Sequence, residues 1–150
     1  MSTFFVDTSA LGRRYLPEIG SAWVRSWIAP TAGHVIIISD LTPVEMFSVL
    51  ARRQRERSIS PSDVTAAQND MLLHVEKEYL SVPLESDVLV QARRLVSQHV
   101  LRTLDAIQLS CALKALTTLG EKMTFVSADK NLLIAAAAEG FTTDNPSLHP

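Results

Sequence analysis

The sequence predicts an α/β fold with a mainly parallel central sheet flanked by helices, and three observations support this. Short apolar segments alternate along the chain with longer segments of helical periodicity. One of them, HVIIIS at 34–39, is continuously apolar and β-branched, as expected of a strand covered on both faces. The chain has 150 residues, 47% of them hydrophobic, which suits a single domain, residues 1–150, with a proper core.

The N-terminal segments begin this alternation. TFFV at 3–6 is predicted to be the first strand, and a short helix is expected at 8–16. A second short helix is expected at 21–29, with its tryptophans Trp23 and Trp27 packed in the core. The strand at 34–39 follows.

A longer helix is predicted at 42–57 from its capping pattern. Thr42 suits the N-cap, Pro43 the first helical position and Glu45 the third position of a capping box. The side of this helix expected to face the core carries Val44, Phe47, Val49, Leu50 and Ala51.

The next segments repeat this logic. A helix at 58–79, capped by Ser60, is followed by a weak strand at 79–84 and a helix at 85–99. Residues expected to face inward are Val64, Met71, Leu72, Val75 and Tyr79 in the first helix, and Val88, Ala92, Leu95 and Val96 in the second.

The C-terminal third is strongly apolar. The segment 103–120 is apolar on nearly every face and predicts a central, buried helix with Thr103 as its N-cap. A buried strand at 123–127, a helix at 128–140 and a last short strand at 141–143 complete the pattern.

The overall charge does not decide whether the chain binds nucleic acid. The net charge is −2, so the chain lacks the basic excess of many nucleic-acid-binding proteins, yet ARRQRER at 51–57 concentrates four arginines. The single cysteine, Cys111, excludes an internal disulfide. No apolar run approaches the roughly 20 residues of a membrane span, and the start lacks a basic leader region, so a cytoplasmic protein is expected.

Four carboxylates are predicted at one edge of the sheet, where open α/β sheets bind ligands. Asp7 directly follows the first strand, and Asp129 follows the strand at 123–127 by two residues. Glu45 and Asp105 lie in the first turns of the helices at 42–57 and 103–120. Ligand chemistry is therefore expected at these four positions.

Each carboxylate also has a structural interpretation. Asp7 can cap the helix that begins at Thr8, Glu45 can serve only the capping box, and Asp129 can complement a helix N-terminus. Asp105 is harder to explain in this way, because an ionised carboxylate beside an apolar helix is unfavourable unless it is paired or bound to metal.

The four carboxylates together are more informative about a ligand than any one of them alone. Several carboxylates that converge without matched lysines repel one another, and a divalent cation relieves that repulsion. Oxygen-only ligands favour Mg²⁺ or Mn²⁺ over zinc, and no zinc-binding motif is present. The four histidines are scattered and are interpreted as structural or surface residues, and Asp144 and Asn145 as minor candidates for metal contact.

The sequence resembles the PIN-domain ribonucleases, and most closely the VapC toxins of bacterial toxin–antitoxin pairs. The segments that carry the resemblance are FVDTSAL at 5–11, LTPVEMFSVLARR at 41–53, LRTLDAIQLSCAL at 101–113 and FVSADKNLLIAAAAEGF at 125–141. Their order and spacing extend it over essentially the whole chain.

The resemblance implies a three-layer fold with strand order 3-2-1-4-5 and an acidic pocket. The pocket residues would be Asp7, Glu45, Asp105 and Asp129, with Asp7 and Asp105 as the firmest ligands of Mg²⁺ or Mn²⁺. Hydroxyls beside the first and fourth acids match the family pattern and are supplied by Thr8, Ser9 and Ser127.

It also implies endoribonuclease chemistry. A metal-activated water would attack a scissile phosphate in line, leaving a 3′-hydroxyl and a 5′-phosphate. Arg102 is the first candidate for a contact with the RNA phosphates, with Arg13, Arg14 and Lys130 also near the expected edge. A VapB-like antitoxin would cover the pocket, docking near 21–29 and 42–57, and a homodimer is expected.

Two alternatives remain open at this point. Asp7 or Asp40, each after a strand, can be imagined as a phosphoacceptor of a signalling domain, although VDTS lacks the paired acids of a receiver domain and the second acid of a DxDxT phosphatase. The chain can also be an inactive PIN binding module, against which the presence of all four acids argues.

Overall fold

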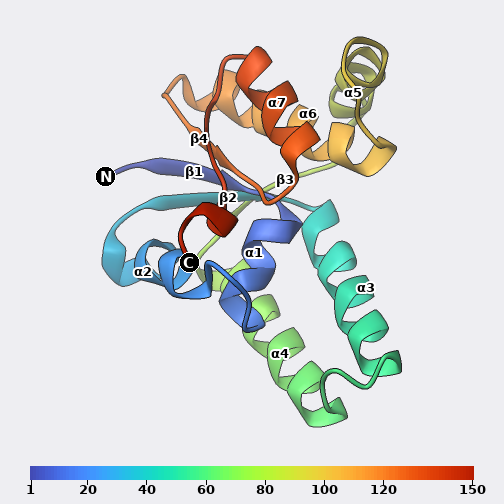
Figure 1. The fold of residues 1–150 in the computed structure, drawn as a ribbon. Coiled ribbons are helices and arrows are strands. Elements are labelled where there is room, and N and C mark those ends of the chain that lie inside the picture. Colours follow the sequence, from blue (N-terminus) through green and yellow to red (C-terminus); the bar gives the residue numbers. More distant parts are fainter.

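In the computed structural model, which describes residues 1–150, five strands form one sheet in the order β3-β2-β1-β4-β5 (Figure 1). The strands are β1 (Thr3–Val6), β2 (Val35–Ser39), β3 (Leu80–Val82), β4 (Thr124–Val126) and β5 (Thr142–Asp144). Every neighbouring pair is parallel. The predicted sheet and its order are therefore confirmed. The weak strand predicted at 79–84 and the short strand predicted at 141–143 form its edges, as β3 and β5.

Seven α-helices connect and cover the strands. They are α1 (Thr8–Tyr15), α2 (Ser21–Ile28), α3 (Leu41–Arg55), α4 (Pro61–Lys77), α5 (Ser86–Gln98), α6 (Thr103–Leu119) and α7 (Lys130–Ala138), with short 3₁₀ turns η1 (Pro30–Ala32) and η2 (Pro146–Leu148). Helices α5, α6 and α7 lie on one side of the sheet and α1 and α2 on the other, while α3 and α4 extend away as a pair (Figure 1). The three-layer arrangement follows from this placement.

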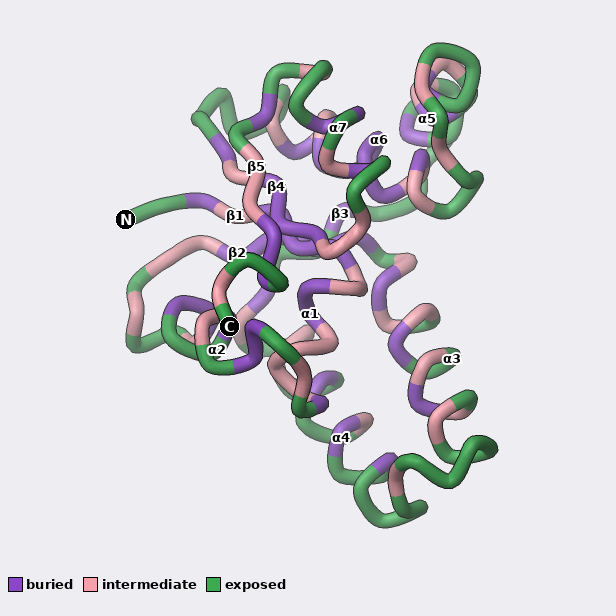
Figure 2. The backbone as a smooth tube through the Cα atoms, viewed as in Figure 1, coloured by how far each residue is buried: buried purple, intermediate pink, exposed green.

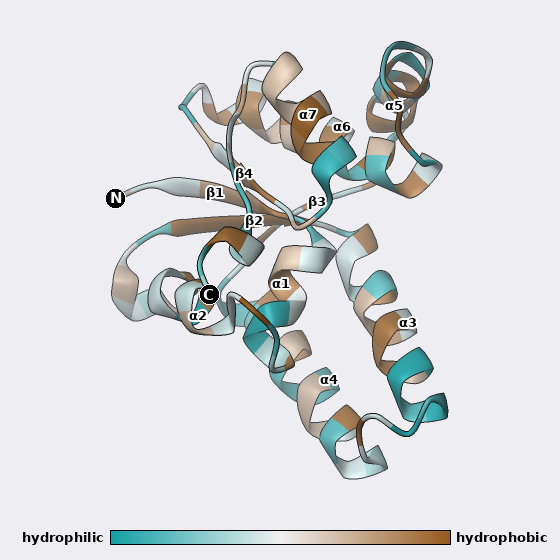
Figure 3. Cartoon of the chain, in the orientation of Figure 1, coloured by the Kyte–Doolittle hydropathy of each residue, from teal (hydrophilic) through white to brown (hydrophobic).

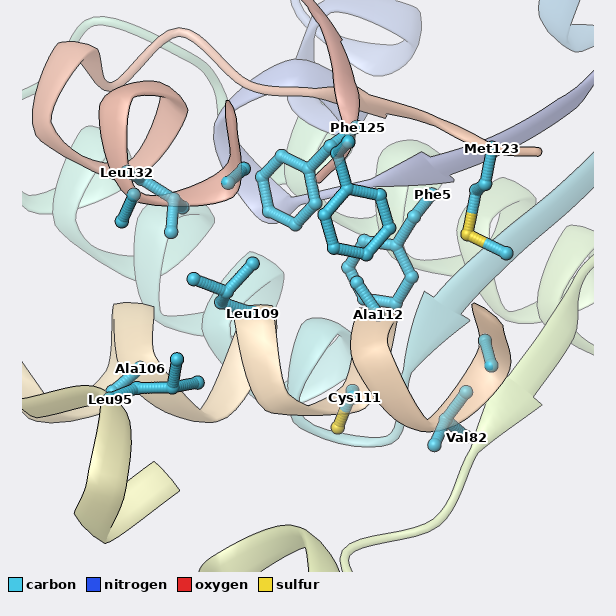
Figure 4. Packing of buried hydrophobic residues seen from close by; sticks show 14 of the residues in the cluster. Phe5, Val82, Leu95, Ala106, Leu109, Cys111, Ala112, Met123, Phe125 and Leu132 are labelled. Carbon is cyan, nitrogen blue, oxygen red and sulfur yellow. The ribbon is translucent and has the colours of Figure 1, made fainter. Parts of the chain in front are cut away.

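The alternation of side chains along the strands explains the two helical layers. Phe5, Ile37 and Phe125 point to one face and join the core under α5, α6 and α7. The rings of Phe5 and Phe125 stack there with centroids 5.4 Å apart (Figure 4). Their neighbours Val6 and Val126 belong to a second core with α1 and α2. The central strands β1, β2 and β4 are thus buried on both faces, as their continuous apolar sequences predict, whereas the edge strands β3 and β5 are more exposed.

The two tryptophans have different environments. Trp27 is buried and stacks on Phe4 with ring centroids 4.4 Å apart, which confirms the core prediction. Trp23 is only partly buried and stacks on His149 at 4.0 Å. It therefore anchors the C-terminal turn as well as α2.

The start of α3 differs from the prediction. The helix begins at Leu41 rather than after Thr42, and the backbone N–H of Leu41 donates to Ser39 Oγ at 3.2 Å. Thr42 is a fully buried helical residue, so it does not form a capping box with Glu45. By contrast, Ser60 caps α4 as predicted and accepts from the N–H of Asp63 at 3.1 Å.

The buried face of α3 also differs. It consists of Thr42, Met46 and Leu50, at a spacing of four residues, whereas Val44 and Phe47 are exposed. The reason is that α3 packs mainly on α1 and α4, so only a narrow stripe is covered. Figure 2 shows the exposed outer turns of α3 and α4, and Figure 3 the hydrophilic end of α3.

Smaller differences affect the other helices. Leu72 and Val96 are exposed although both were predicted to face inward, because α4 and α5 are covered on one side only. Thr103 is the first residue of α6 and Arg102 occupies the N-cap position without a side-chain bond, so Thr103 is not the cap. Helix α6 packs against α5, α7 and strands β2 and β3, and buries Cys111 as predicted.

None of the helices combines the length and the apolar character that crossing a membrane requires.

Candidate active site

The four predicted acids line one pocket at the carboxyl end of the sheet. The N–H of Asp7 still bonds the carbonyl of Val126 in β4 at 3.1 Å, and Asp129 lies three residues beyond Val126. Glu45 lies on α3 and Asp105 in the first turn of α6. The pocket has a volume of about 660 Å³, and the structure thus brings together side chains from four distant segments.

Asp7 is the most buried of the four. Its side chain caps α1, with Oδ1 accepting from the N–H of Ala10 at 3.1 Å, so the structural interpretation of Asp7 is correct as far as it goes. Burial raises the pKa of Asp7 to about 6, an effect that outweighs its hydrogen bonds, and the charge of Asp105 adds to the rise. No basic side chain pairs with Asp7, so only hydrogen bonds offset the burial of its charge.

Two serines join Asp7 to the end of β4. Ser9 donates to Asp7 Oδ1 at 2.7 Å and Ser127 donates to Asp7 Oδ2 at 2.9 Å, so both carboxylate oxygens are held. Ser127 also accepts from the N–H of Asp129, and Ser9 from that of Ala128. The two serines thus fix the relative positions of the first and fourth acids.

Glu45 is held at one oxygen only. Its Oε1 accepts from the hydroxyl of Thr8 and from the side-chain amide of Gln108, both at 2.7 Å. Glu45 Oε2 has no hydrogen-bond partner in the chain. One carboxylate oxygen is therefore anchored, and the other remains available to a ligand.

Asp105 and Asp129 share a basic partner. The guanidinium of Arg102 donates to Asp105 Oδ2 at 3.1 Å and to Asp129 Oδ2 at 3.2 Å, while its side chain remains 82% exposed. Burial raises the pKa of Asp105, Arg102 opposes that rise, and the charge of Asp129 adds to it. Asp129 also caps α7 through the N–H of Leu132, so it has both a structural role and a place in the pocket.

The atoms available as metal ligands are of the kind that a hard divalent cation prefers. All candidate ligands are oxygens, two of the acids have raised pKa values, and Asp7 and Asp105 are each raised further by a neighbouring acid. As the side chains lie, no group of three or more His, Cys, Asp or Glu residues is placed to hold a metal ion together. Binding would therefore require the carboxylates to draw closer, with Arg102 released from its bridge.

Basic side chains also line this pocket: Arg13, Arg52, Arg53 and Arg102. Arg13 and Arg53 both pair with Glu18. Arg52 is exposed and has no ion pair in the chain, which leaves it free for an anionic ligand. Arg14 instead pairs with Glu78, and neither it nor Lys130 lines the pocket.

The remaining candidates lie elsewhere. Asp144 pairs with His149 at 2.8 Å, and Asn145 caps η2, so neither faces the pocket. His34, His74 and His99 contact Ser2, Tyr15 and Glu139 respectively, consistent with structural histidines. Asp40 is exposed and outside the pocket.

Sequence reasoning missed Gln108. This side chain is only 2% exposed and reaches Thr8, Thr42 and Glu45 from the interior of α6. The signal was present in the sequence, because an amide in a helix that is apolar on nearly every face needs a buried polar partner.

A family model described as the PIN domain matches residues 4–138. The chain therefore belongs to the PIN domain family. The match spans all four pocket acids. Among curated proteins, no sequence matches this chain.

Solved structures share the fold at low sequence identity. PAE2754 from Pyrobaculum aerophilum is 20% identical with a TM-score of 0.63, covering 98% of this chain and 91% of that one. A toxin–antitoxin complex from Klebsiella pneumoniae is 13% identical with a TM-score of 0.59, covering 96% and 98%. VapBC-5 of the VapBC toxin–antitoxin family, from Mycobacterium tuberculosis, is 15% identical with a TM-score of 0.55, covering 97% and 98%.

Proposed function

We propose that this chain is a metal-dependent endoribonuclease that acts as the toxin of a VapBC-like toxin–antitoxin pair. One observation carries the nuclease part of the proposal: four carboxylates from four distant segments of a PIN-family chain line a single pocket. Like charges in a partly buried pocket are favourable only with a cation, and a divalent cation is a suitable catalyst of phosphodiester hydrolysis.

In this proposal Mg²⁺ or Mn²⁺, when bound, lowers the pKa of a water and neutralises charge on the scissile phosphate. Asp7 and Asp105 are the principal ligands, with Glu45 and Asp129 completing the set. Ser9 and Ser127 hold both oxygens of Asp7 in place, which limits the reorganisation that binding requires. Glu45 Oε2 is the free oxygen that can orient the attacking water.

The RNA strand is proposed to lie across the pocket with its phosphates on basic side chains. Arg52 is free of ion pairs, and Arg102 is exposed and bridges two acids that a metal would engage. The Arg102 guanidinium would donate to a phosphate oxygen, since its partners Asp105 and Asp129 are themselves proposed metal ligands. In this proposal Asp7, Glu45, Asp105 and Asp129 would hold the metal, and Arg52 and Arg102 would hold the RNA backbone beside them.

The nuclease proposal is tested by cleavage of a single-stranded RNA by metal-stripped protein. We expect no cleavage with EDTA, recovery with Mg²⁺ or Mn²⁺, and products with 5′-phosphate and 3′-hydroxyl ends. Cleavage that persists in EDTA, or that leaves 2′,3′-cyclic phosphates, would exclude the mechanism. Phosphorylation of Asp7 by a phosphodonor, in a bond that alkali and hydroxylamine cleave, would instead favour the phosphoacceptor alternative. The burial of Asp7, which is only 4% exposed, disfavours that alternative.

The toxin role is supported by the structural likeness to the Klebsiella and Mycobacterium toxin–antitoxin proteins together with this chain's family. A VapB-like antitoxin is proposed to cover α3, where the exposed Val44 lines the acidic pocket and Phe47 is exposed on the same helix. A homodimer and a cytoplasmic location belong to the same proposal.

Induced expression tests the toxin role. We expect growth arrest with the wild-type chain, and normal growth with Asp7→Asn, Asp105→Asn or a co-expressed cognate antitoxin. Arrest that persists with both substituted proteins at equal abundance would contradict the toxin role of this pocket.

A further inference from the structure

Gln108 is buried among apolar side chains of α6, yet its amide contacts three side chains from other elements. The amide nitrogen lies 3.2 Å from Thr8 Oγ1 of α1, and 3.1 Å and 2.7 Å from Thr42 Oγ1 and Glu45 Oε1 of α3. Gln108 therefore ties together the two helices that follow β1 and β2. Burial of an amide in such a helix is unfavourable unless these bonds form.

The orientation of the amide is set by Glu45. The reversed amide would bring the Gln108 oxygen to 2.7 Å from Glu45 Oε1, a repulsive contact with an ionised carboxylate. In the observed orientation Gln108 Oε1 has no hydrogen-bond partner, so one buried acceptor is left unsatisfied. In this orientation Glu45 Oε1 gains a hydrogen bond while Gln108 Oε1 has none. The bond to Glu45 therefore outweighs the cost of leaving the buried amide oxygen unpaired.

These bonds distinguish the two carboxylate oxygens of Glu45. Thr8 and Gln108 both donate to Oε1, whereas Oε2 has no partner. Two donors from different helices fix the rotation of the carboxylate and leave one defined oxygen free. Without Gln108, only the hydroxyl of Thr8 would hold Glu45, and that hydroxyl can rotate.

We infer that Gln108 is a positioning residue of the active site, which acts through Glu45 by anchoring Oε1 and presenting Oε2 to the metal or to its water. The inference rests on the proposed metal-dependent nuclease function. Such outer partners of ligating carboxylates typically change metal affinity or activity by about 10–100-fold when removed.

The test compares Gln108→Met, which keeps volume but removes the donor, with Ser110→Ala. Ser110 is a matched control, because it is buried on the same helix and bonds the carbonyl of Val88 at 2.5 Å, away from Glu45. We expect Gln108→Met to lower kcat for RNA cleavage by about 10–100-fold with KM within about threefold. We also expect it to weaken Mn²⁺ binding to the RNA-free protein, followed by electron paramagnetic resonance of free Mn²⁺. In Gln108→His the ring N–H reaches about as far as the glutamine amide, so this variant should retain most of the wild-type kcat and Mn²⁺ affinity.

A double-mutant cycle separates positioning from a structural role. In a Glu45→Gln background, Gln108→Met should reduce kcat little further, because its effect passes through Glu45. If Gln108→Met does not fold, Thr8→Val removes the other donor to the same oxygen and must show the same loss and the same lack of additivity.

Equal losses in Ser110→Ala and Gln108→Met, or losses that multiply with Glu45→Gln, would overturn the role of Gln108. So would wild-type kcat and Mn²⁺ affinity in Gln108→Met. A wild-type chain that neither cleaves RNA with metal nor binds Mn²⁺ would overturn the proposed function and this inference together.

Discussion

Asp7→Asn is expected to abolish RNA cleavage while making the fold more stable at neutral pH. Activity should fall by more than about 100-fold, because loss of a proposed direct metal ligand should exceed the 10–100-fold typical of outer-shell changes. Stability should rise because the ionised carboxylate is buried without a cation. The difference between its pKa of about 6 and the ordinary 3.8 corresponds to about 3 kcal/mol.

The pH dependence of this gain follows from the raised pKa. Protonated Asp7 suits the fold, so its stabilising contribution is full below about pH 4 and is lost as pH rises through about 6. Urea unfolding in EDTA should therefore show Asp7→Asn more stable than wild type by up to about 3 kcal/mol at pH 8, and nearly equal to it near pH 4. Added Mg²⁺ should stabilise the wild type alone. A substituted protein that is less stable than wild type at pH 8 would contradict this account of Asp7.

Asp105→Asn is expected to remove activity as completely but with a different effect on stability. Its carboxylate is half-buried and already faces the Arg102 guanidinium, so neutralising it relieves burial but weakens an ion pair on an exposed arginine. The two effects oppose each other, and the free energy of unfolding should change by less than about 1 kcal/mol.

The measurement is RNA cleavage and urea unfolding of Asp105→Asn beside Asp87→Asn. Asp87 is a matched control, since it lies near the start of α5 and pairs with Lys114 away from the pocket. Asp87→Asn should cleave RNA at the wild-type rate. Asp105→Asn with activity within tenfold of wild type would remove Asp105 from the site.

Much of the fold could be read from the sequence because the central strands β1, β2 and β4 are buried on both faces. A continuous apolar segment such as VIIIS leaves little choice other than a central strand, and Gly120 ends α6 as its left-handed backbone requires. The order of the strands came from the family resemblance, since alternation alone fixes a parallel sheet but not its order.

The errors concern which face of a helix is covered. Periodicity placed Val44 and Phe47 in the core, but α3 projects from the sheet and buries only the stripe through Met46 and Leu50. Sequence does not reveal how far a helix projects, because apolar side chains beside a functional pocket look the same as core residues.

The sequence predicted the four acids of the site, but not the hydrogen bonds that hold their side chains in place. The rule that ligands bind beyond the carboxyl ends of parallel strands placed Asp7, Glu45, Asp105 and Asp129 together. The bonds from Gln108 and Thr8 to one oxygen of Glu45 depend on how side chains of α1, α3 and α6 meet at the pocket, which no local pattern encodes.

The central claim is that these carboxylates form a divalent-metal centre that cleaves RNA. Its most direct test is the cleavage rate of a single-stranded RNA as a function of Mn²⁺ concentration, for wild type and Asp7→Asn in one assay. We predict a saturable, metal-dependent rate for the wild type and no cleavage above background for Asp7→Asn at any concentration. Cleavage by the wild type without metal, or an unchanged metal dependence in Asp7→Asn, would contradict the claim.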